Sequence, residues 1–391
     1  MAHYNEFQDF NNSREIPNPF GGSAPKTAII YKYDNNRYML KRSKGKRSGN
    51  VEIPNNNSVF SEHVGSVIFK LCGFDVHKTY IGEFKGDLVV GCKDFTQFGT
   101  KLHEFSKLVL ADTKVMSVDT IEEVKNVIDR SPLLKKKGKT EAFNKFWDVF
   151  VVDALINNPD RNNNNWGFIE KFGNLEFSTV YDNGSALGAR ICDEEIKLLL
   201  ENPQIFKNTE VNNALAYYRC GGRRIQFREF LKNPPAEFEK EINDAVKRIV
   251  PKVSQNLKKI VELIETCPYM STARKDFTRK AISMRYNEIL LPAYDRVYEA
   301  ERAAKGLPPA PKKLIDVYIH EVPDQYKSAE QIKLDKEFFA RANMDPRRIR
   351  VEDVPESVIR KPASPFTEVK KTETETKTSK KGAFPPKPSG R

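Results

Sequence analysis

Hydrophobic and polar positions alternate over short runs in the first hundred residues, which predicts a small β-sheet. Residues 27–33 (TAIIYKY) are rich in β-branched and aromatic side chains, and residues 37–41 (RYMLK) follow after the turn sequence Asp-Asn-Asn. A second pair of strands is predicted at residues 76–84 and 87–91, joined by Lys-Gly. Between the two pairs, residues 59–71 have apolar side chains at helical spacing and end close to a glycine, which predicts one helix.

After about residue 97, apolar residues recur at the spacing typical of helices. The sequence predicts helices at residues 117–131, 143–154, 236–266 and 271–304, with two short strands at residues 166–170 and 175–181. The fold class is therefore α+β with two lobes. Residues 18–96 form an N-terminal lobe of a small antiparallel sheet plus one helix, and residues 97–305 form a mostly helical C-terminal lobe.

Both ends of the chain differ in composition from the two lobes. Residues 1–17 are predicted to be a flexible lead-in. Residues 306–360 begin with the linker sequence LPPAPKK and carry one short predicted helix at residues 329–343. Residues 361–391 are rich in Pro, Thr and Lys and have few large apolar side chains, so that they cannot offset the entropy cost of ordering. We expect a disordered basic tail there.

Composition excludes several classes of protein. The five cysteines are odd in number and show no CxxC spacing, which argues against a disulfide framework and for a reducing compartment. No apolar run approaches the length of a membrane helix, and the N-terminus lacks the apolar core of a signal peptide. The net charge is +12, concentrated in the tail and in basic runs at residues 41–47, 135–139 and 219–224. Because no nucleic-acid-binding motif accompanies this charge, we do not expect nucleic acid to be the primary partner.

The sequence NNPDRNNNNW at residues 157–166 is the most informative stretch for chemistry. An acid, Asp160, follows a buried helix and precedes a strand, Asn165 lies five residues beyond it, and a hairpin later the chain reaches Asp182. Such an arrangement suits phosphoryl transfer, with Asp160 orienting an attacking hydroxyl or accepting its proton. The amide oxygen of Asn165 and the carboxylate of Asp182 are hard ligands suited to Mg²⁺.

Simpler interpretations of this loop exist. An Asn-rich segment is often only a turn, because Asn tolerates left-handed backbone. A calcium-binding loop would place Asp160, Asn162 and Asn164 at its first, third and fifth positions. That interpretation fails at Asn165, where a glycine is required, and at Lys171, where a bidentate Glu is required.

The N-terminal lobe adds three features in the order that a nucleotide site requires. Gly21, Gly22 and Ser23 precede the first predicted strand, where small residues would let backbone N–H groups approach phosphates. Lys41 ends the second strand and Glu62 lies in the helix, which is the pairing that kinases use at the α- and β-phosphates. Each has a simpler explanation: a turn for the glycines, a solvated basic run for Lys41, and an exposed helix face for Glu62.

Residues 91–95 (GCKDF) would connect the lobes. Their backbone could pair with adenine, and Asp94 could reach a ribose hydroxyl. Each feature alone is ordinary, but all of them in this order along the chain predict ATP-dependent phosphoryl transfer.

Taken together, these segments resemble the HipA-like bacterial serine/threonine kinases. The resemblance rests on the FGG, MLK, SEHVGSVIF, VVGCKDF, FWDVFVVDALINNPDRNNNNWGF and VYDNGSAL sequences and covers residues 18 to about 298. It implies a two-lobed protein-kinase-like fold that uses ATP and Mg²⁺, and it leads us to expect autophosphorylation. It also implies Asp160 at the catalytic position, Asn165 and Asp182 at the metal positions, and Lys41 on the phosphates with Glu62 as its partner. Gly91 and Lys93 would supply hinge backbone contacts and Asp94 the ribose contact.

The sequence also departs from kinase patterns. The loop reads PDR rather than HRD, Asn-Gly follows Asp182, Asn162 replaces a histidine, and neither GxGxxG nor APE is present. The leading expectation is a protein kinase with a Ser or Thr acceptor. The alternatives are a lipid or small-molecule kinase, a non-catalytic nucleotide-binding interaction protein, and a toxin tethered to nucleic acid by its basic tail. The family resemblance leaves two settings open: the cytoplasm, or secretion or translocation without a classical signal peptide.

Overall fold

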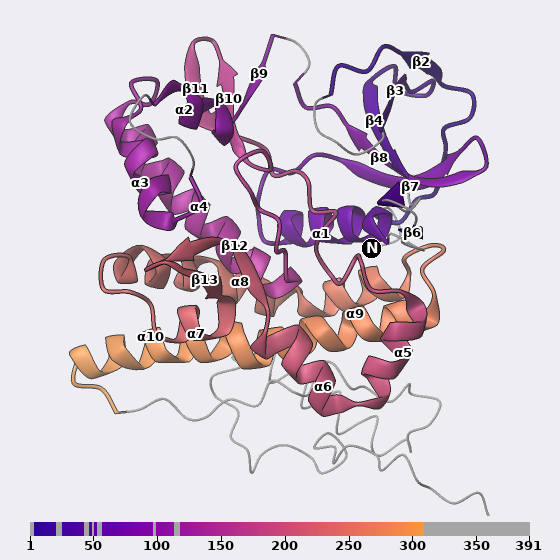
Figure 1. The fold of residues 1–391 in the computed structure, drawn as a ribbon. Helices are drawn as coiled ribbons and strands as arrows, with labels where there is room; N and C mark the ends of the chain where they lie inside the picture. The colour runs from indigo at the N-terminus through magenta and orange to yellow at the C-terminus, as the bar shows by residue number, and fades with distance from the viewer. Residues whose placement is uncertain are drawn as a thin grey trace, which may run out of the picture.

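The structure is a computed structural model that describes residues 4–20, 26–42, 47–48, 51–52, 57–96, 99–112 and 118–308. A curled sheet with one helix beneath it occupies the upper right of Figure 1, and a larger helical part lies below and to the left. The predicted α+β class is confirmed by this arrangement. The predicted helix at residues 329–343 and the predicted disordered tail at residues 361–391 lie outside the described residues.

The main sheet has six strands in the order β1-β7-β8-β4-β3-β2. All neighbours in it are antiparallel except β1 and β7, which run parallel. The strands are β1 (Gln8–Asp9), β2 (Arg14–Ile16), β3 (Lys26–Ile30), β4 (Arg37–Arg42), β7 (Thr79–Phe84) and β8 (Asp87–Lys93). The four predicted strands of this lobe therefore form as β3, β4, β7 and β8.

The prediction of a flexible lead-in at residues 1–17 is wrong for the part of it that the structure describes. β1 pairs with β7 and β2 pairs with β3, so this segment supplies both edges of the sheet. The side chain of Phe10 is fully buried and packs directly over Gly91. The physical reason for the error is that the segment is ordered by one buried ring and by sheet pairing, and neither leaves an alternating pattern in such short strands.

Helix α1 (Ser58–Leu71) lies between the sheet and the helical part (Figure 1). It contacts β7 and β8 on one side and α8 on another, so almost all of its central side chains are buried. Gly65 is needed in this position, because a Cβ atom there would lie 2.9 Å from the Cβ of Asn183. The helix therefore passes close to the segment that carries Asp182.

The helical part is built around α4 (Lys136–Ile156) and α8 (Glu239–Glu265), which pack against each other. Around them lie α2 (Phe105–Ala111), α3 (Ile121–Arg130), α5 (Asp193–Glu201), α6 (Pro203–Lys207), α7 (Phe227–Lys232), α9 (Thr272–Arg285) and α10 (Leu291–Ala304). Two π-helical turns, η2 (Asn208–Asn212) and η3 (Tyr286–Leu290), follow α6 and α9. The helix predicted at residues 271–304 therefore contains a π-helical turn just before Pro292, which lacks the N–H that regular helix requires.

Three small sheets complete the fold of the described residues. A three-stranded sheet has the order β11-β10-β9, formed by β9 (Lys101–Glu104), β10 (Gly167–Lys171) and β11 (Asn174–Phe177). The two remaining sheets each pair two antiparallel strands, β12 (Leu215–Cys220) with β13 (Arg223–Gln226) and β5 (Arg47–Ser48) with β6 (Val51–Glu52). The segment between α4 and β10 carries the Asp-Asn loop, which is thereby fixed between a core helix and a sheet.

Candidate active site

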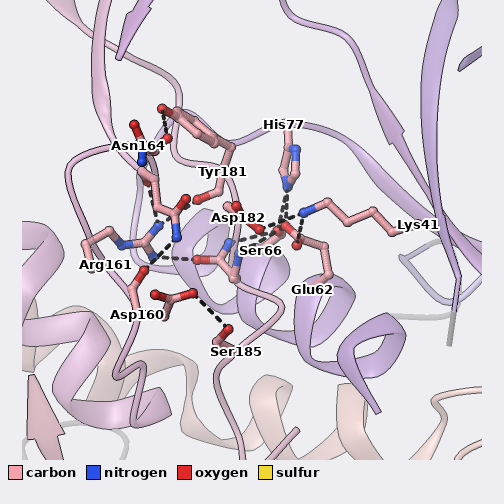
Figure 2. A network of polar contacts seen from close by, with 12 residues as sticks. Lys41, Glu62, Ser66, His77, Asp160, Arg161, Asn164, Tyr181, Asp182 and Ser185 are labelled. Atoms are coloured by element: carbon pink, nitrogen blue, oxygen red, sulfur yellow. Dashed lines mark hydrogen bonds and ion pairs between the residues drawn. The ribbon is translucent and has the colours of Figure 1, made fainter. Parts of the chain in front are cut away.

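Lys41 lies at the centre of the candidate site, between two carboxylates. Its Nζ donates to Oε2 of Glu62 at 2.6 Å and to Oδ1 of Asp182 at 2.8 Å (Figure 2). The three residues come from β4, from α1 and from the segment after β11. The structure thus brings together three of the residues that the sequence placed in one site, although Lys41 and Asp182 are 141 positions apart. Glu62 is fully buried, so the simpler explanation of an exposed helix face is wrong.

The electrostatic surroundings of Lys41 and Glu62 favour the charged form of each side chain. Burial by itself lowers the pKa of Lys41, but Asp182 and Glu62 outweigh it and raise that pKa well above its usual value. Burial by itself raises the pKa of Glu62, but Lys41 and His77 hold that pKa well below its usual value. The charged form of Lys41 is therefore favoured at the sheet face that points toward α1.

The second carboxylate oxygen of Glu62 is engaged as well. His77 Nε2 lies 2.9 Å from Oε1, and the backbone N–H of Asn183 donates to the same oxygen at 3.1 Å. Ser66 links these two partners, because its hydroxyl lies 3.1 Å from His77 Nε2 and accepts a bond from the Asn183 amide at 3.0 Å. Glu62 is therefore held in one position from both sides, and Lys41 with it (Figure 2).

Among the described residues, one cluster has three side chains of the types that bind metals. It consists of Glu62, His77 and Cys92, all buried, and their potential ligand atoms lie within 4.8 Å of one another. Glu62 already binds Lys41 and Asn183. Burial raises the pKa of the Cys92 thiol above its usual value, which disfavours the thiolate in the structure as it stands. We therefore assign Glu62 and His77 to the Lys41 network.

The Asp-Asn loop begins where α4 ends. Asn157 ends the helix in left-handed backbone, with φ at 50°, which turns the chain out of the helix and into the loop. Both carboxylate oxygens of Asp160 accept hydrogen bonds, Oδ1 from the Asn162 amide at 2.8 Å and Oδ2 from the Ser185 hydroxyl at 3.2 Å. These two bonds fix the direction of the carboxylate. Because Asp160 is only half-buried, the carboxylate is still reachable from outside.

Arg161 joins the loop to the rest of the site. Its buried guanidinium donates to the carbonyl oxygens of Asn165 at 3.0 Å and Tyr181 at 2.6 Å, and to the Asn183 side-chain oxygen at 2.6 Å. It also donates to both carboxylate oxygens of Asp153 on α4, each at 2.9 Å. One side chain therefore sets the relative positions of α4, the Asp-Asn loop and the segment that carries Asp182.

The two residues predicted as metal ligands lie in segments that Arg161 holds together. The side-chain amide of Asn165 donates its N–H to the carbonyl oxygen of Asp160 at 2.6 Å, which fixes the amide plane and leaves the amide oxygen as its possible cation ligand. Asp182 has left-handed backbone, with φ at 58°, and its carboxylate is partly exposed. A carboxylate and an amide oxygen fit Mg²⁺, which takes few protein oxygens and completes its shell with phosphate and water.

The predicted hinge residues lie in or beside β8 and are occupied by contacts within the protein. Gly91 pairs with Leu40 on one side and Tyr80 on the other. The backbone N–H groups of Lys93 and Asp94 donate to the carbonyl oxygens of Lys78 at 2.8 Å and Arg37 at 2.9 Å, respectively.

The carboxylate of Asp94 is buried, contacts the Arg37 guanidinium and accepts bonds from Thr96. Contacts of these residues with adenine or ribose would have to share or replace these bonds, so both roles stay predictions. Gly21, Gly22 and Ser23 lie outside the described residues.

The sequence analysis missed Arg161, His77 and Ser185. A usable signal existed for Arg161, because Asp153 is an acid within the otherwise apolar run FVVDALI and a buried acid requires a partner. For His77 and Ser185 we find no signal in the sequence. Their contacts with Glu62 and Asp160 depend on segments that meet only in the folded protein.

Comparisons with known proteins agree with this geometry. The family model described as HipA-like C-terminal domain matches residues 19–257. The chain is 30% identical over 286 residues to the serine/threonine-protein kinase CtkA of Helicobacter pylori, which covers 72% of this chain and 85% of that relative. The crystal structure of a Helicobacter pylori proinflammatory kinase CtkA matches with a TM-score of 0.67 at 28% identity, over 76% of this chain and 99% of that chain.

A more remote match is HipA of Shewanella oneidensis MR-1, solved with HipB and operator DNA. Its TM-score is 0.45 at 11% identity, over 74% of this chain and 75% of that chain. The match with the CtkA structure confirms the predicted two-lobed, kinase-like fold. No helix within the described ranges is both long enough and apolar enough to cross a membrane.

Proposed function

The chain belongs to the HipA-like C-terminal domain family and is a serine/threonine protein kinase, and we propose that it uses ATP with Mg²⁺ and also phosphorylates itself. The family expected from the sequence motifs is thereby confirmed. The assignment of residues to roles in this reaction is our proposal. The observation that carries it is the contact of Lys41 with both Glu62 and Asp182, within one hydrogen-bonded network that also includes Arg161 (Figure 2).

In the proposed reaction, Asp160 orients the acceptor hydroxyl and accepts its proton. The hydroxyl oxygen of a Ser or Thr side chain bonds to the γ-phosphorus as the bond between that phosphorus and its bridging oxygen breaks, and ADP leaves. The bonds from Asn162 and Ser185 to the carboxylate of Asp160 support this role, because they fix its direction. Such positioning supplies much of the rate enhancement in phosphoryl transfer.

Lys41 is proposed to contact the α- and β-phosphates, with Glu62 holding it in place. Asn165 and Asp182 are proposed to hold Mg²⁺, which neutralises charge on the phosphates when bound. The same Asp182 contacts Lys41, so the phosphate contact and the metal contact would lie side by side. The backbone roles of Gly21, Gly22 and Ser23 are proposed from the sequence alone.

The test measures transfer of labelled phosphate from ATP to protein, with and without a generic protein acceptor. The wild-type protein should label Ser or Thr residues, and the Asp160→Asn variant should label about 10²-fold less while still binding ATP. Asp129→Asn is a matched control, because Asp129 has an exposed carboxylate on α3 that pairs with the neighbouring Lys125. Equal labelling by the wild type and the Asp160→Asn variant would refute the role of Asp160.

The remaining alternatives give distinct outcomes. Label in lipids or in small hydroxyl compounds, but not in protein, would contradict the proposed acceptor. Binding of ATP without transfer to any acceptor would instead indicate a nucleotide-binding interaction protein. Labelling of the purified protein itself, at a rate per molecule that does not change on dilution, would support autophosphorylation within one molecule. Whether the protein stays in the cytoplasm or is translocated is a separate prediction, which cell fractionation would test.

A further inference from the structure

The hairpin of β12 and β13 (residues 215–226) carries a basic sequence that the proposed function does not use. Residues 219–224 read RCGGRR, and the side chains of Arg219, Arg223 and Arg224 are all exposed. Gly221 and Gly222 form the turn in left-handed backbone, with φ at 55° and 76°, so the chain reverses tightly between the two strands. The arginines are thereby gathered at one end of the hairpin.

The hairpin is fastened to the Asp-Asn loop. Nη2 of Arg224 donates to the carbonyl oxygen of Pro159 at 3.3 Å, and Pro159 immediately precedes Asp160. The hydroxyl of Tyr218 donates to the side-chain oxygen of Asn163 at 2.6 Å, on the other side of Asp160 along the chain. A protein segment whose hydroxyl reaches the Asp160 carboxylate therefore brings its flanking residues near the hairpin.

The acidic side chains next to the hairpin already have partners within the protein. Asp119 forms an ion pair with Arg219, with 3.4 Å between the carboxylate oxygen and Nε. Glu122, at the start of α3, accepts a hydrogen bond from the backbone N–H of Gly221 at 3.2 Å. The charge of Arg219 is therefore offset within the protein.

Arg223 and Arg224 differ from Arg219 in this respect, because neither forms an ion pair with a carboxylate of the described residues. Arg224 instead donates to the carbonyl oxygens of Ala216 at 2.8 Å and Pro159 at 3.3 Å. These bonds hold its side chain in place without removing its charge. Since a guanidinium has five N–H donors, both arginines retain donors for a negatively charged ligand.

We propose that Arg223 and Arg224 form a docking site for an acidic segment of the protein acceptor, so that the kinase prefers Ser or Thr residues flanked by Asp or Glu. The planar guanidinium matches the carboxylate group in geometry as well as in charge. The position beside Asp160 favours the acceptor over nucleic acid, because the acceptor must reach this residue. The inference rests on the proposed function, since it assumes that the acceptor hydroxyl binds at Asp160.

The test measures KM and kcat of the full chain for serine peptides of equal length, in which the serine is flanked by Glu, by Gln or by Lys. For the wild type, KM should be about fivefold or more lower for the Glu peptide than for the Gln peptide, and raised salt should reduce this difference. Arg223→Glu should reverse the order, so that the Lys peptide has the lowest KM, while kcat for the Gln peptide stays unchanged.

Two further variants complete the design. Arg224→Gln removes the charge but keeps an N–H donor for the Pro159 carbonyl oxygen, so it should weaken the preference for the Glu peptide and leave kcat for the Gln peptide unchanged. Arg14→Glu is the matched control for charge reversal, because Arg14 is an exposed arginine on β2, at an edge of the main sheet. It should leave the order of the peptides as in the wild type.

The outcomes separate this inference from the proposed function. If the wild type transfers phosphate to no peptide and no protein, the proposed function fails. If it uses the Glu and Gln peptides with equal KM, only the docking site fails. The inference is also overturned if Arg223→Glu keeps the wild-type order of peptides but loses binding to double-stranded DNA, because the arginines would then serve nucleic acid. Thermal unfolding of each variant shows whether the fold is intact.

Discussion

Arg161 donates to both carboxylate oxygens of Asp153, and this buried pair connects the last turns of α4 to the Asp-Asn loop. The same guanidinium reaches backbone oxygens at Asn165 and Tyr181. The pair of Arg161 and Asp153 therefore stabilises the folded protein. Arg161 also holds the proposed catalytic loop and the segment that carries Asp182 in fixed relative positions. These two roles can be separated by mutation.

We expect Arg161→Met to reduce both stability and activity. It leaves Asp153 buried without a partner, which costs about 3–5 kcal/mol in the free energy of unfolding. The double variant Arg161→Met, Asp153→Leu removes the unpaired charge, so stability should largely return. Phosphoryl transfer should not return, because the contacts with Asn165 and Tyr181 stay absent. Urea unfolding and phosphate transfer measured on both variants test this, and activity restored along with stability would show that Arg161 has no positioning role.

The pairing of Glu62 with Lys41 predicts a pH dependence of stability. The pKa of Glu62 lies below its unfolded value of 4.5, so the folded protein binds fewer protons there than the unfolded chain does. The stability from Glu62 is therefore complete above about pH 4.5 and is lost as the pH falls toward the lower folded pKa. We expect the difference in free energy of unfolding between wild type and Glu62→Gln to shrink on acidification. A difference that stays constant from pH 7 to about pH 3 would contradict the charged pair.

The packing of Phe10 on Gly91 predicts non-additive effects on stability. A Cβ atom at Gly91 would lie 2.4 Å from the Phe10 ring, so Gly91→Ala should destabilise the protein by about 1–3 kcal/mol. Phe10→Ala empties a fully buried site and should cost about 3–5 kcal/mol. In the double variant the clash is gone, so the total should be clearly smaller than the sum. Urea unfolding measures all three, and strict additivity would mean that the two residues do not contact.

Much of the main sheet and of the site could be predicted from local patterns. The strand that carries Lys41, the helix that carries Glu62 and the loop that carries Asp160 each have a pattern confined to a few neighbouring residues. Their order along the chain then indicated that Lys41, Glu62 and Asp182 lie near one another. The contacts of Lys41 with both carboxylates agree with this part of the prediction.

The parts that were missed depend on contacts between distant segments. β1 has only two residues, Gln and Asp, and its order comes from β7 and from the burial of Phe10. Ser185 reaches Asp160 only because the chain returns through the β10–β11 hairpin. For Asp94, the sequence pattern predicted the strand that leads to this residue but not the side chain that contacts its carboxylate. That side chain is Arg37, which lies on the neighbouring strand β4.

The contact of Asn165 with Asp160 makes the proposed metal role testable on its own. In the structure the Asn165 amide N–H donates to the Asp160 carbonyl oxygen, while its amide oxygen is the proposed Mg²⁺ ligand. Asn165→Ala removes both atoms, and we expect about a tenfold or larger increase in the Mg²⁺ concentration that gives half-maximal phosphate transfer. Raised Mg²⁺ should then restore much of the activity, because Asp182 still supplies a carboxylate.

Asp160→Asn provides the contrast for this measurement. Its defect is loss of the proton acceptor, so no concentration of Mg²⁺ should restore phosphate transfer. If Asn165→Ala instead keeps the wild-type dependence on Mg²⁺ and loses only its maximal rate, Asn165 acts through its bond to the Asp160 backbone and not as a ligand. The shape of the Mg²⁺ titration therefore distinguishes the two roles, because a lost ligand moves its midpoint and a displaced loop lowers its plateau.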